Sequence, residues 1–579
     1  MLSSARPGRA TARLGVLALV LGAFGAVSAA ASPADAAARN PVVSTDGGVV
    51  RGLAGGATEQ YRGIPYAAPP VGELRWRPPQ PAARHVGVRD ATSFAPHCAQ
   101  AASPYGKASS SEDCLYLNVY VPAGTKPAAK RPVMVWIHGG ALEVGESEGY
   151  DPTPLVRDGV VVVTINYRLG ALGFLAHPAL SGEAGGSSGN YGLMDQQAAL
   201  RWVQRNIGGF GGNAGNVTIF GESAGGLSVL SQLASQRAGG LFAKAIVESG
   251  AYAPKQASQA SANTAGTRFA VDAGCPSQSV GCLRALPVAR VLATKHAGLG
   301  WQPNVDGRVL TQSITTALAS GQFNRVPLLN GSNADEWRLF VASYDLAGAP
   351  VTAATYQSAI SATLSVDAAT AATLVARYPL SAYRSPDLAL GAVGTDAIFA
   401  CNARKVDQLA SRYVQTYAYE FADEKAPQRF LPPVSYPYGA YHASELQYLL
   451  DLPGTPRPGG LTAGQQHLAS TMQRYWTGFA ATGSPSGTGA GPQWPAYNTV
   501  DERFQRLSTP SPATAAGFAA EHKCTVSPSP VRVNAGSGGQ AADSTPTVAR
   551  TVDLGVLAVF GIALVAGCGW QLRRHRTRH

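Results

Sequence analysis

The segment 221–225, Gly-Glu-Ser-Ala-Gly, places a serine between two glycines. An apolar run, 217–220, precedes it, and small residues that begin a helical pattern, 226–230, follow it. A sharp strand-to-helix turn exposes the hydroxyl of such a serine, and the glycines permit the crowded backbone. The helix N-terminus then favours developing negative charge. The motif alone arises by chance in a chain with 66 glycines. The flanking strand and helix are therefore what predict Ser223 as a nucleophile for acyl transfer.

A second loop of small residues, 137–141 (Ile-His-Gly-Gly-Ala), follows another apolar run, 133–137. Backbone N–H groups in such a loop can bind the oxyanion that forms when a serine attacks an ester carbonyl. We predict a further donor in the N–H of Ala224, the residue after the nucleophile. His138 lies within the loop, and we interpret it as structural because serine hydrolases of this type have their base later in the chain.

The base is predicted by elimination, because the catalytic residues should follow the chain order serine, acid, histidine. The histidines that follow the apolar run 326–329 are His442, His467, His522, His575 and His579. His467 lies in a helical pattern, His522 lies beside a cysteine near the end of the predicted body, and the last two lie beyond a C-terminal apolar segment. His442 lies in a predicted loop before a helix, where an imidazole can reach the serine. We predict His442 as the base, with a buried structural histidine as the alternative.

Two acidic residues, Asp335 and Glu336, come next after the run 326–329. Either could hold the imidazole tautomer and stabilise the imidazolium. Either could instead cap the helix that follows. Position in the chain does not choose between them.

The predicted fold is α/β, with a mostly parallel central sheet covered by helices on both faces. Short apolar, β-branched runs alternate with longer helical patterns, which is typical of buried parallel strands. The helical patterns include 195–206 and 468–481, and the predicted strands are 133–137, 160–165, 217–220, 243–247, 326–329 and 417–421.

Motifs spread over nearly the whole predicted body resemble the type-B carboxylesterase and cholinesterase-like family of α/β-hydrolases. Two long segments are similar to signatures of that family: 112–122 (Glu-Asp-Cys-Leu-Tyr-Leu-Asn-Val-Tyr-Val-Pro) and 210–225, which contains Gly-Glu-Ser-Ala-Gly. Shorter similar segments are 61–67, 189–193, 195–196, 478–483 and 494–497. The resemblance implies the α/β-hydrolase fold and ester hydrolysis without a metal or an organic cofactor.

The resemblance also implies roles for individual residues. It makes Glu336 the acid, with Asp335 as its neighbour, and His442 the base. It implies that the oxyanion donors are the backbone N–H groups of Gly140, Ala141 and Ala224. Two departures affect these expectations. Leu142 stands where many relatives have an aromatic residue, so the shape of the acyl pocket is open. Trp337 stands where many have glycine, so the geometry of the acid loop is open.

Seven cysteines are present, and one of them, Cys568, lies in the C-terminal apolar segment. An even set of six in an exported protein favours disulfides over a metal site, but six cysteines allow 15 pairings. The resemblance implies the pairs Cys98–Cys114, Cys275–Cys282 and Cys401–Cys524. The Cys98–Cys114 loop is shorter than in cholinesterases, so we do not expect choline-ester specificity.

Both ends carry signals for membranes. Residues 1–38 combine a basic start, an apolar run (14–27) and small residues, which predicts a signal peptide cleaved after Ala38, with Ala31 as the alternative site. An uncleaved anchor is the other interpretation. The predicted body covers 39–524, and a Ser/Pro/Gly-rich stalk covers 525–550.

The segment 552–572 is long and apolar enough to cross a bilayer, and a basic tail, 573–579, follows it. Arginine prefers the cytoplasmic side, so we predict that the body lies at the extracellular face of the membrane. A helix packed on the body is one alternative. Release, or attachment to the cell wall through a sortase-like signal at 548–552, is another, although that segment lacks the expected leading Leu and final Gly.

The charge of the chain gives no sign of a nucleic-acid partner. The formal charge is +11, but removing seven arginines and one aspartate of the two ends leaves 39 basic and 34 acidic residues. No basic stripe lies within the body. The prediction is an exported serine carboxylesterase acting on a small-molecule ester. The alternatives are a catalytically silent adhesion module on the same fold, and a hydrolase for amides, carbamates or long-chain lipid esters.

Overall fold

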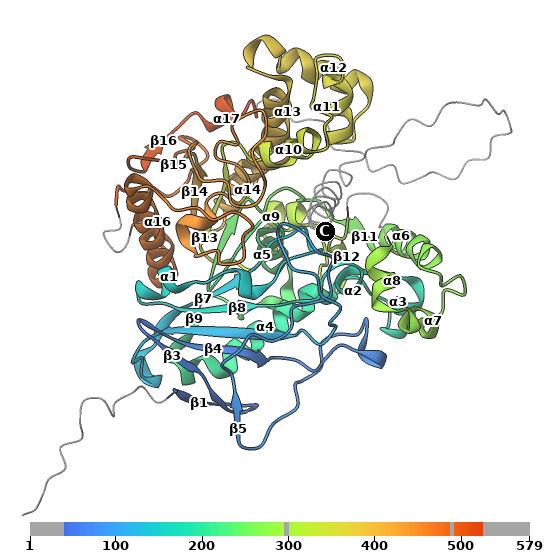
Figure 1. Cartoon of the computed structure of the whole chain (residues 1–579), viewed down its shortest axis with the longest axis vertical. Helices are drawn as coiled ribbons and strands as arrows, with labels where there is room; N and C mark the ends of the chain where they lie inside the picture. The colour runs from blue at the N-terminus through green and yellow to red at the C-terminus, as the bar shows by residue number, and fades with distance from the viewer. Residues whose placement is uncertain (1–39, 295–299, 487–490, 525–579) are drawn as a thin grey trace, which may run out of the picture. The chain divides into compact units, whose positions relative to one another are not determined.

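The computed structural model describes residues 40–294, 300–486 and 491–524. Its main feature is an eleven-stranded sheet in the order β16-β15-β14-β13-β10-β9-β7-β8-β6-β4-β3 (Figure 1). The strands are β1 (Val42–Thr45), β2 (Gly48–Arg51), β3 (Leu53–Gly55), β4 (Thr58–Pro65), β5 (Val88–Asp90), β6 (Tyr116–Pro122), β7 (Arg131–Ile137), β8 (Val161–Ile165), β9 (Gly212–Glu222), β10 (Lys244–Glu248), β11 (Ala257–Ser258), β12 (Asn304–Val305), β13 (Leu328–Asn333), β14 (Thr416–Phe421), β15 (Phe504–Leu507) and β16 (Ala513–Ala515).

The α-helices alternate with these strands through the middle of the chain. They are α1 (Thr153–Arg157), α2 (Gly170–Phe174), α3 (Pro178–Glu183), α4 (Tyr191–Asn206), α5 (Ala224–Ala234), α6 (Gln259–Asp272), α7 (Val280–Ala285), α8 (Val288–Ala293), α9 (Ile314–Ser320), α10 (Arg338–Leu346), α11 (Tyr356–Leu364), α12 (Ala368–Arg377), α13 (Pro386–Gly394), α14 (Cys401–Ala410), α15 (Leu446–Leu449), α16 (Ala463–Thr482) and α17 (Phe518–Glu521).

The centre of the sheet is parallel and its edges are antiparallel. Strands β8, β7, β9, β10, β13, β14 and β15 pair in parallel. The pairs β3–β4, β4–β6, β6–β8 and β15–β16 are antiparallel. The six predicted strands correspond to β7, β8, β9, β10, β13 and β14, so the expected mostly parallel sheet is confirmed. The antiparallel edges were not predicted.

Strand β7 shows why the predicted central strands contain unbroken apolar runs. Successive side chains of a strand point to opposite faces of the sheet. Val133, Val135 and Ile137 pack into one core with α4 and α5, whereas Met134 and Trp136 pack into a second core with α1 and α16. Helices therefore cover both faces, and both faces must be apolar.

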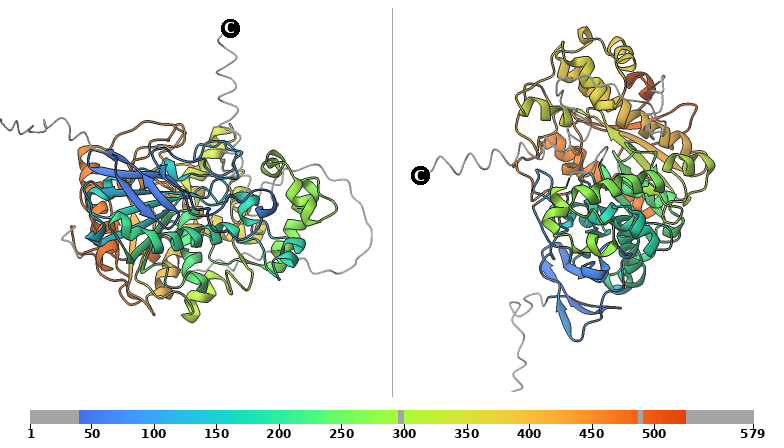
Figure 2. Two further views of the ribbon diagram at one scale, coloured as in Figure 1. Left: turned by 90° about the horizontal axis from the view of Figure 1, so that it is seen from below. Right: turned by 90° about the vertical axis from the view of Figure 1, so that its right-hand side faces the viewer.

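Helices α10, α11 and α13 form a third core together with tyrosines of the segment that ends at residue 441. Figures 1 and 2 show α10–α13 gathered beyond the β13–β14 part of the sheet. This core holds the segment 436–442 against the start of α10.

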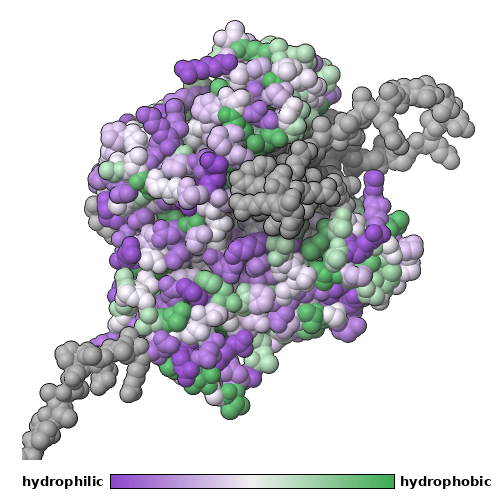
Figure 3. Space-filling model, in the orientation of Figure 1, coloured by the Kyte–Doolittle hydropathy of each residue, from purple (hydrophilic) through white to green (hydrophobic). Residues whose placement is uncertain are grey.

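Hydrophilic and hydrophobic residues are interspersed over the face that Figure 3 shows. The large hydrophobic side chains that are exposed among the described residues are separate valines: Val42, Val71, Val86, Val88, Val271 and Val500. Single exposed apolar residues are ordinary on a protein surface.

Within the described ranges, no single helix is both long and apolar enough to cross a membrane. One bent pair, Tyr356–Leu364 with Ala368–Ala382, passes by length and composition. The predicted signal peptide (1–38), stalk (525–550), membrane span (552–572) and basic tail (573–579) all lie outside the residues that the structure describes.

Candidate active site

Ser223 occupies the single-residue turn between β9 and α5. Its backbone has φ 56° and ψ −121°, which is uncommon for a residue other than glycine. The Ser223 N–H donates to the carbonyl of Glu248 at the end of β10, at 2.9 Å. A serine held in this strained turn matches the predicted strand-to-helix context of the nucleophile.

Close backbone contacts explain the glycines around Ser223. A Cβ at Gly221 would lie 2.5 Å from the carbonyl oxygen of Ile137, and a Cβ at Gly225 would lie 1.9 Å from the same oxygen. Both distances are far shorter than real Cβ contacts. The glycines therefore let the end of β7 approach the turn, and this brings the predicted oxyanion loop beside the serine.

The predicted oxyanion loop lies against Ser223. A Cβ at Gly139 would lie 3.1 Å from the Cβ of Ser223. Gly140 has φ 104°, and Ala141 and Leu142 have φ 58° and 61°. These three consecutive residues with positive φ form a tight turn. The N–H groups of residues 143 and 144 close the turn by donating to the Gly140 carbonyl, both at 3.0 Å.

The predicted oxyanion donors have no competing acceptor in the loop. Among the residues that the structure describes, the N–H groups of Gly140 and Ala141 donate to no other group. Ala224 is the first residue of α5, and the first N–H groups of a helix lack acceptors within the helix. These N–H groups are available beside the serine.

His138 is buried and faces its own loop rather than a reaction site. Its ring stacks on Tyr167 with centroids 4.5 Å apart, and its Nδ1 lies 2.9 Å from the carbonyl oxygen of Gly139. The Tyr167 hydroxyl donates to the His138 carbonyl at 2.7 Å. Burial lowers the pKa of His138 to about 4. A neutral ring that donates from Nδ1 to a carbonyl fits the predicted structural role.

Glu336 is fully buried and contacts the imidazole of His442. Its Oε2 lies 2.6 Å from Nδ1 of His442. Its other oxygen accepts from the Asn333 N–H at 2.8 Å and from the Ser249 hydroxyl. In a neutral imidazole whose Nδ1 donates to this carboxylate, Nε2 is the acceptor nitrogen.

Asp335 has a different set of partners. It pairs with Arg338 at 2.7 Å and accepts from the Ala440 N–H at 2.9 Å. The structure thus brings Glu336, and not Asp335, to His442. Position in the chain had left this choice open, and the resemblance had implied it.

The Nε2 atom of His442 faces the serine turn. It lies 3.2 Å from Oε1 of Glu222, the residue that immediately precedes Ser223. The rings of Phe340 and Phe399 pack on the imidazole, with centroids 5.1 and 5.0 Å away. Within the described residues the Ser223 hydroxyl has no hydrogen-bond partner. Catalytic hydrogen bonds often tighten only when substrate is bound.

The competing histidines have other surroundings. His467 is exposed on α16. His522 is buried between two carboxylates, with Nδ1 2.6 Å from Asp396 and Nε2 2.6 Å from Glu420. His442 is thus the histidine of this set that contacts both Glu336 and the residue preceding Ser223.

Three further buried glutamates surround this site, and sequence reasoning missed them. They are Glu222, Glu248 and Glu445. Burial, reinforced by neighbouring carboxyls, raises the pKa of Glu222 and of Glu445 well above the ordinary value. Burial also raises the pKa of Glu248 to about 7, although Trp476 donates to it at 2.8 Å. Glu222 was visible inside the serine motif, but its burial depends on tertiary packing that the motif does not encode.

Comparisons with known proteins identify relatives of this chain. The model of the carboxylesterase family matches residues 39–526. A pyrethroid hydrolase, Ces2e, of Rattus norvegicus is 36% identical over 502 residues, which cover 81% of this chain and 86% of the relative. A para-nitrobenzyl esterase of Bacillus subtilis (strain 168) is 35% identical over 79% of this chain and 92% of the relative. A cholinesterase of Mus musculus is 32% identical over 81% and 83%.

The chain belongs to the carboxylesterase family. It is a carboxylic ester hydrolase with the α/β-hydrolase fold, as the resemblance implied. These relatives are a hydrolase, an esterase and a cholinesterase, so they do not favour the alternative of a catalytically silent binding module on this fold.

The esterase accommodates Trp337 through a glycine on a neighbouring helix. Trp337 is buried and packs on Phe340, with ring centroids 4.5 Å apart. A Cβ at Gly394, the last residue of α13, would lie 2.1 Å from the indole. The missing side chain at Gly394 therefore makes room for the indole, and the neighbouring Glu336 keeps its contact with His442.

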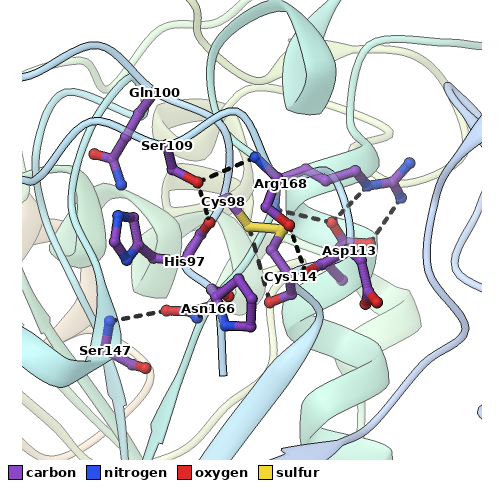
Figure 4. The surroundings of a disulfide bond; sticks show 12 residues. His97, Cys98, Gln100, Ser109, Asp113, Cys114, Ser147, Asn166 and Arg168 are labelled. Carbon is purple, nitrogen blue, oxygen red and sulfur yellow. Dashed lines mark hydrogen bonds and ion pairs between the residues drawn. A yellow bond between two sulfur atoms is a disulfide. The ribbon is translucent and has the colours of Figure 1, made fainter. Parts of the chain in front are cut away.

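The six cysteines that the structure describes form three disulfides, in the pairs that the resemblance implied. They are Cys98–Cys114, Cys275–Cys282 and Cys401–Cys524. Figure 4 shows the first of these with the residues around it. Within the described residues, no group of three or more His, Cys, Asp or Glu side chains could hold a metal ion.

Proposed function

We propose that the esterase acts through an acyl-enzyme on Ser223, with His442 as general base and Glu336 as the acid of the triad. His442 Nε2 takes the proton of the Ser223 hydroxyl as Oγ attacks the ester carbonyl. The N–H groups of Gly140, Ala141 and Ala224 stabilise the oxyanion. The imidazolium then protonates the leaving alcohol.

In the second half of the reaction, His442 accepts a proton from water as the water attacks the acyl-enzyme, and Ser223 recovers its proton when the carboxylic acid leaves. The Glu336 carboxylate holds the tautomer of the imidazole and stabilises the imidazolium. The observation that supports this proposal most strongly is the 2.6 Å contact between Glu336 and His442, beside the strained turn that carries Ser223.

The test replaces the nucleophile. Ser223→Ala should lower kcat for p-nitrophenyl acetate by about 10⁶-fold, as loss of a serine nucleophile does elsewhere. Ser470→Ala is the matched control, because this exposed serine of α16 bonds only to a carbonyl of its own helix. The proposal fails if Ser223→Ala folds and retains the activity of the control.

We also propose that the esterase is exported and held at the extracellular face of the membrane by the segment 552–572. The three disulfides are typical of exported proteins. The basic start and apolar run of residues 1–38, and the apolar segment followed by arginines at the other end, support this location.

A further inference from the structure

Gln100 is almost completely buried, with 1% of its surface exposed, and its carboxamide makes two hydrogen bonds to a single backbone residue. Its Nε2 donates to the carbonyl of Gly145 at 3.0 Å, and its Oε1 accepts from the N–H of Gly145 at 2.6 Å. This reciprocal pair imitates the bonding between two antiparallel strands. It satisfies both groups of the carboxamide and both groups of Gly145.

Gly145 in turn packs on the segment that begins the oxyanion loop. It has φ 115°, and a Cβ there would lie 2.5 Å from the carbonyl oxygen of Gly139 and 2.5 Å from Nδ1 of His138. Gly139 itself borders Ser223, since a Cβ on Gly139 would lie 3.1 Å from the Cβ of Ser223. A continuous series of close contacts therefore runs from Gln100 through Gly145 and Gly139 to the nucleophile.

Gln100 is well placed to act as a fixed clamp because its own loop is tied down. It lies two residues after Cys98 in the loop closed by the Cys98–Cys114 disulfide (Figure 4). Its backbone N–H and C=O pair with Ser109 across this loop, at 2.9 and 3.0 Å. A second hydrogen bond joins the disulfide loop to the segment that contains Gly145: the N–H of Lys107 donates to Oε2 of Glu146 at 3.0 Å.

We propose that Gln100 is a positioning residue for ester hydrolysis, whose carboxamide fixes Gly145 and thereby holds residues 139–141 where their N–H groups meet the oxyanion. This inference rests on the proposed function, because it takes Gly140 and Ala141 as oxyanion donors. Gln100 contacts neither the nucleophile nor the base. Its effect passes through the backbone of the loop.

The expected size of the effect follows from the role of the donors. Removal of one oxyanion donor costs about 10²–10³ in kcat, and a displacement of about 1 Å costs about 10²-fold. A substitution that only loosens the oxyanion loop should lower kcat by a smaller factor than the loss of a donor does. We expect Gln100→Met, which keeps the length of the side chain but neither hydrogen bond, to lower kcat for p-nitrophenyl acetate by about 10- to 100-fold with KM nearly unchanged.

The matched control is Gln204→Met. Gln204 also donates from a partly buried Nε2 to backbone carbonyls, those of Ala214 and Leu241, but it lies on α4 outside the site. A trifluoromethyl ketone, which forms an oxyanion-bearing adduct with a serine nucleophile, supplies the decisive second measurement. Its inhibition constant should rise in Gln100→Met by the same factor by which kcat falls, and should not change in Gln204→Met.

A second variant separates positioning from mere loss of packing. In Gln100→Glu a protonated carboxyl can still donate to the Gly145 carbonyl and accept from its N–H, whereas an ionised carboxylate can only accept. The ratio of kcat in Gln100→Glu to kcat in the unsubstituted esterase, taken at each pH, should approach one at acidic pH. It should fall as the pH rises through the pKa of the new carboxyl, which burial will raise.

The outcomes separate this inference from the proposed function. Unchanged kcat in Gln100→Met, a lowered kcat without a matching change in ketone affinity, or a Gln100→Glu ratio that does not vary with pH would each overturn the positioning role while Ser223→Ala remains inactive. If Ser223→Ala remained active instead, the proposed function would fail first. A fall in kcat that the ketone affinity follows, together with the pH-dependent ratio, would establish the role.

Discussion

At the scale of single residues, the site depends on which carboxylate reaches the imidazole. Asp335 and Glu336 are neighbours in sequence, and position in the chain treats them alike. In the structure Asp335 is engaged by Arg338, whereas Glu336 lies 2.6 Å from Nδ1 of His442. The difference arises from the turn between β13 and α10, which sends successive side chains in different directions.

This difference gives a paired prediction. Glu336→Gln keeps the shape of the side chain but removes the charge that stabilises the imidazolium, and it should lower kcat by about 10⁴-fold. Asp335→Asn keeps an acceptor for the Ala440 N–H and should change kcat by less than about tenfold. Steady-state kinetics on p-nitrophenyl acetate measure both. A larger fall in kcat in Asp335→Asn than in Glu336→Gln would mean that Asp335, and not Glu336, is the acid of the triad.

The residues that sequence reasoning missed are those whose properties depend on burial. Glu248 and Glu445 have no distinguishing pattern along the chain, yet packing around the site raises the pKa of both carboxyls. Gln100 likewise is an ordinary polar residue in the sequence. Its importance lies in a hydrogen-bonded pair with a residue 45 positions away.

At the scale of elements, the sequence predicted the strands that are buried on both faces. Each of β7, β8, β9, β10, β13 and β14 contains a short apolar run, and that run is a sufficient signal for a buried strand. The edge strand β16 (Ala-Thr-Ala) is short and largely exposed, and it carries no such run. For the same reason the start of β9 was missed: the strand begins at Gly212, five residues before the predicted start at 217, and residues 212–216 are polar or small.

The final described segment is tied to the body through His522 as well as through a disulfide. His522 bridges Asp396 and Glu420, and Cys524 pairs with Cys401 at the start of α14. The two carboxylates outweigh burial and raise the pKa of His522 to about 10. The imidazole is therefore protonated in the folded esterase throughout the neutral range.

A pH dependence of stability follows from this bridge. The folded-state pKa lies above the ordinary value of 6.5, so the stabilisation is fully present below about pH 6.5 and is lost as the pH rises through about 10. At pH 6, His522→Gln should lower the free energy of unfolding by about 3 kcal/mol, the lower end of the cost of breaking a buried ion pair. Denaturant unfolding of both proteins from pH 6 to pH 10 measures the difference, which should shrink with rising pH.

The control for this measurement is His467→Gln, because His467 is exposed on α16. This variant should differ from the unsubstituted esterase by less than about 0.5 kcal/mol at every pH. A His522→Gln difference that stays constant up to pH 10 would mean that the imidazole is neutral in the bridge.

At the scale of the whole molecule, the esterase body and the proposed membrane segment are separate parts of the chain. The family match ends at residue 526, at the start of the predicted stalk (525–550) and before the segment 552–572. The body should therefore fold and act without them. Deletion of 552–579 should release active esterase into the medium, while the full chain stays with the cells. Fractionation followed by an esterase assay measures this, and a truncated protein that remains fully cell-associated would contradict the anchor.

The central claim is that Ser223 is the residue that becomes acylated, and a fluorophosphonate probe tests it most directly because it bonds to activated serines. Mass spectrometry of the digested, labelled esterase should find one added phosphonyl group on the peptide that contains Ser223, and none after prior heating or in Ser223→Ala. Labelling of a different residue in the active protein, or inhibition without any label on Ser223, would contradict the account.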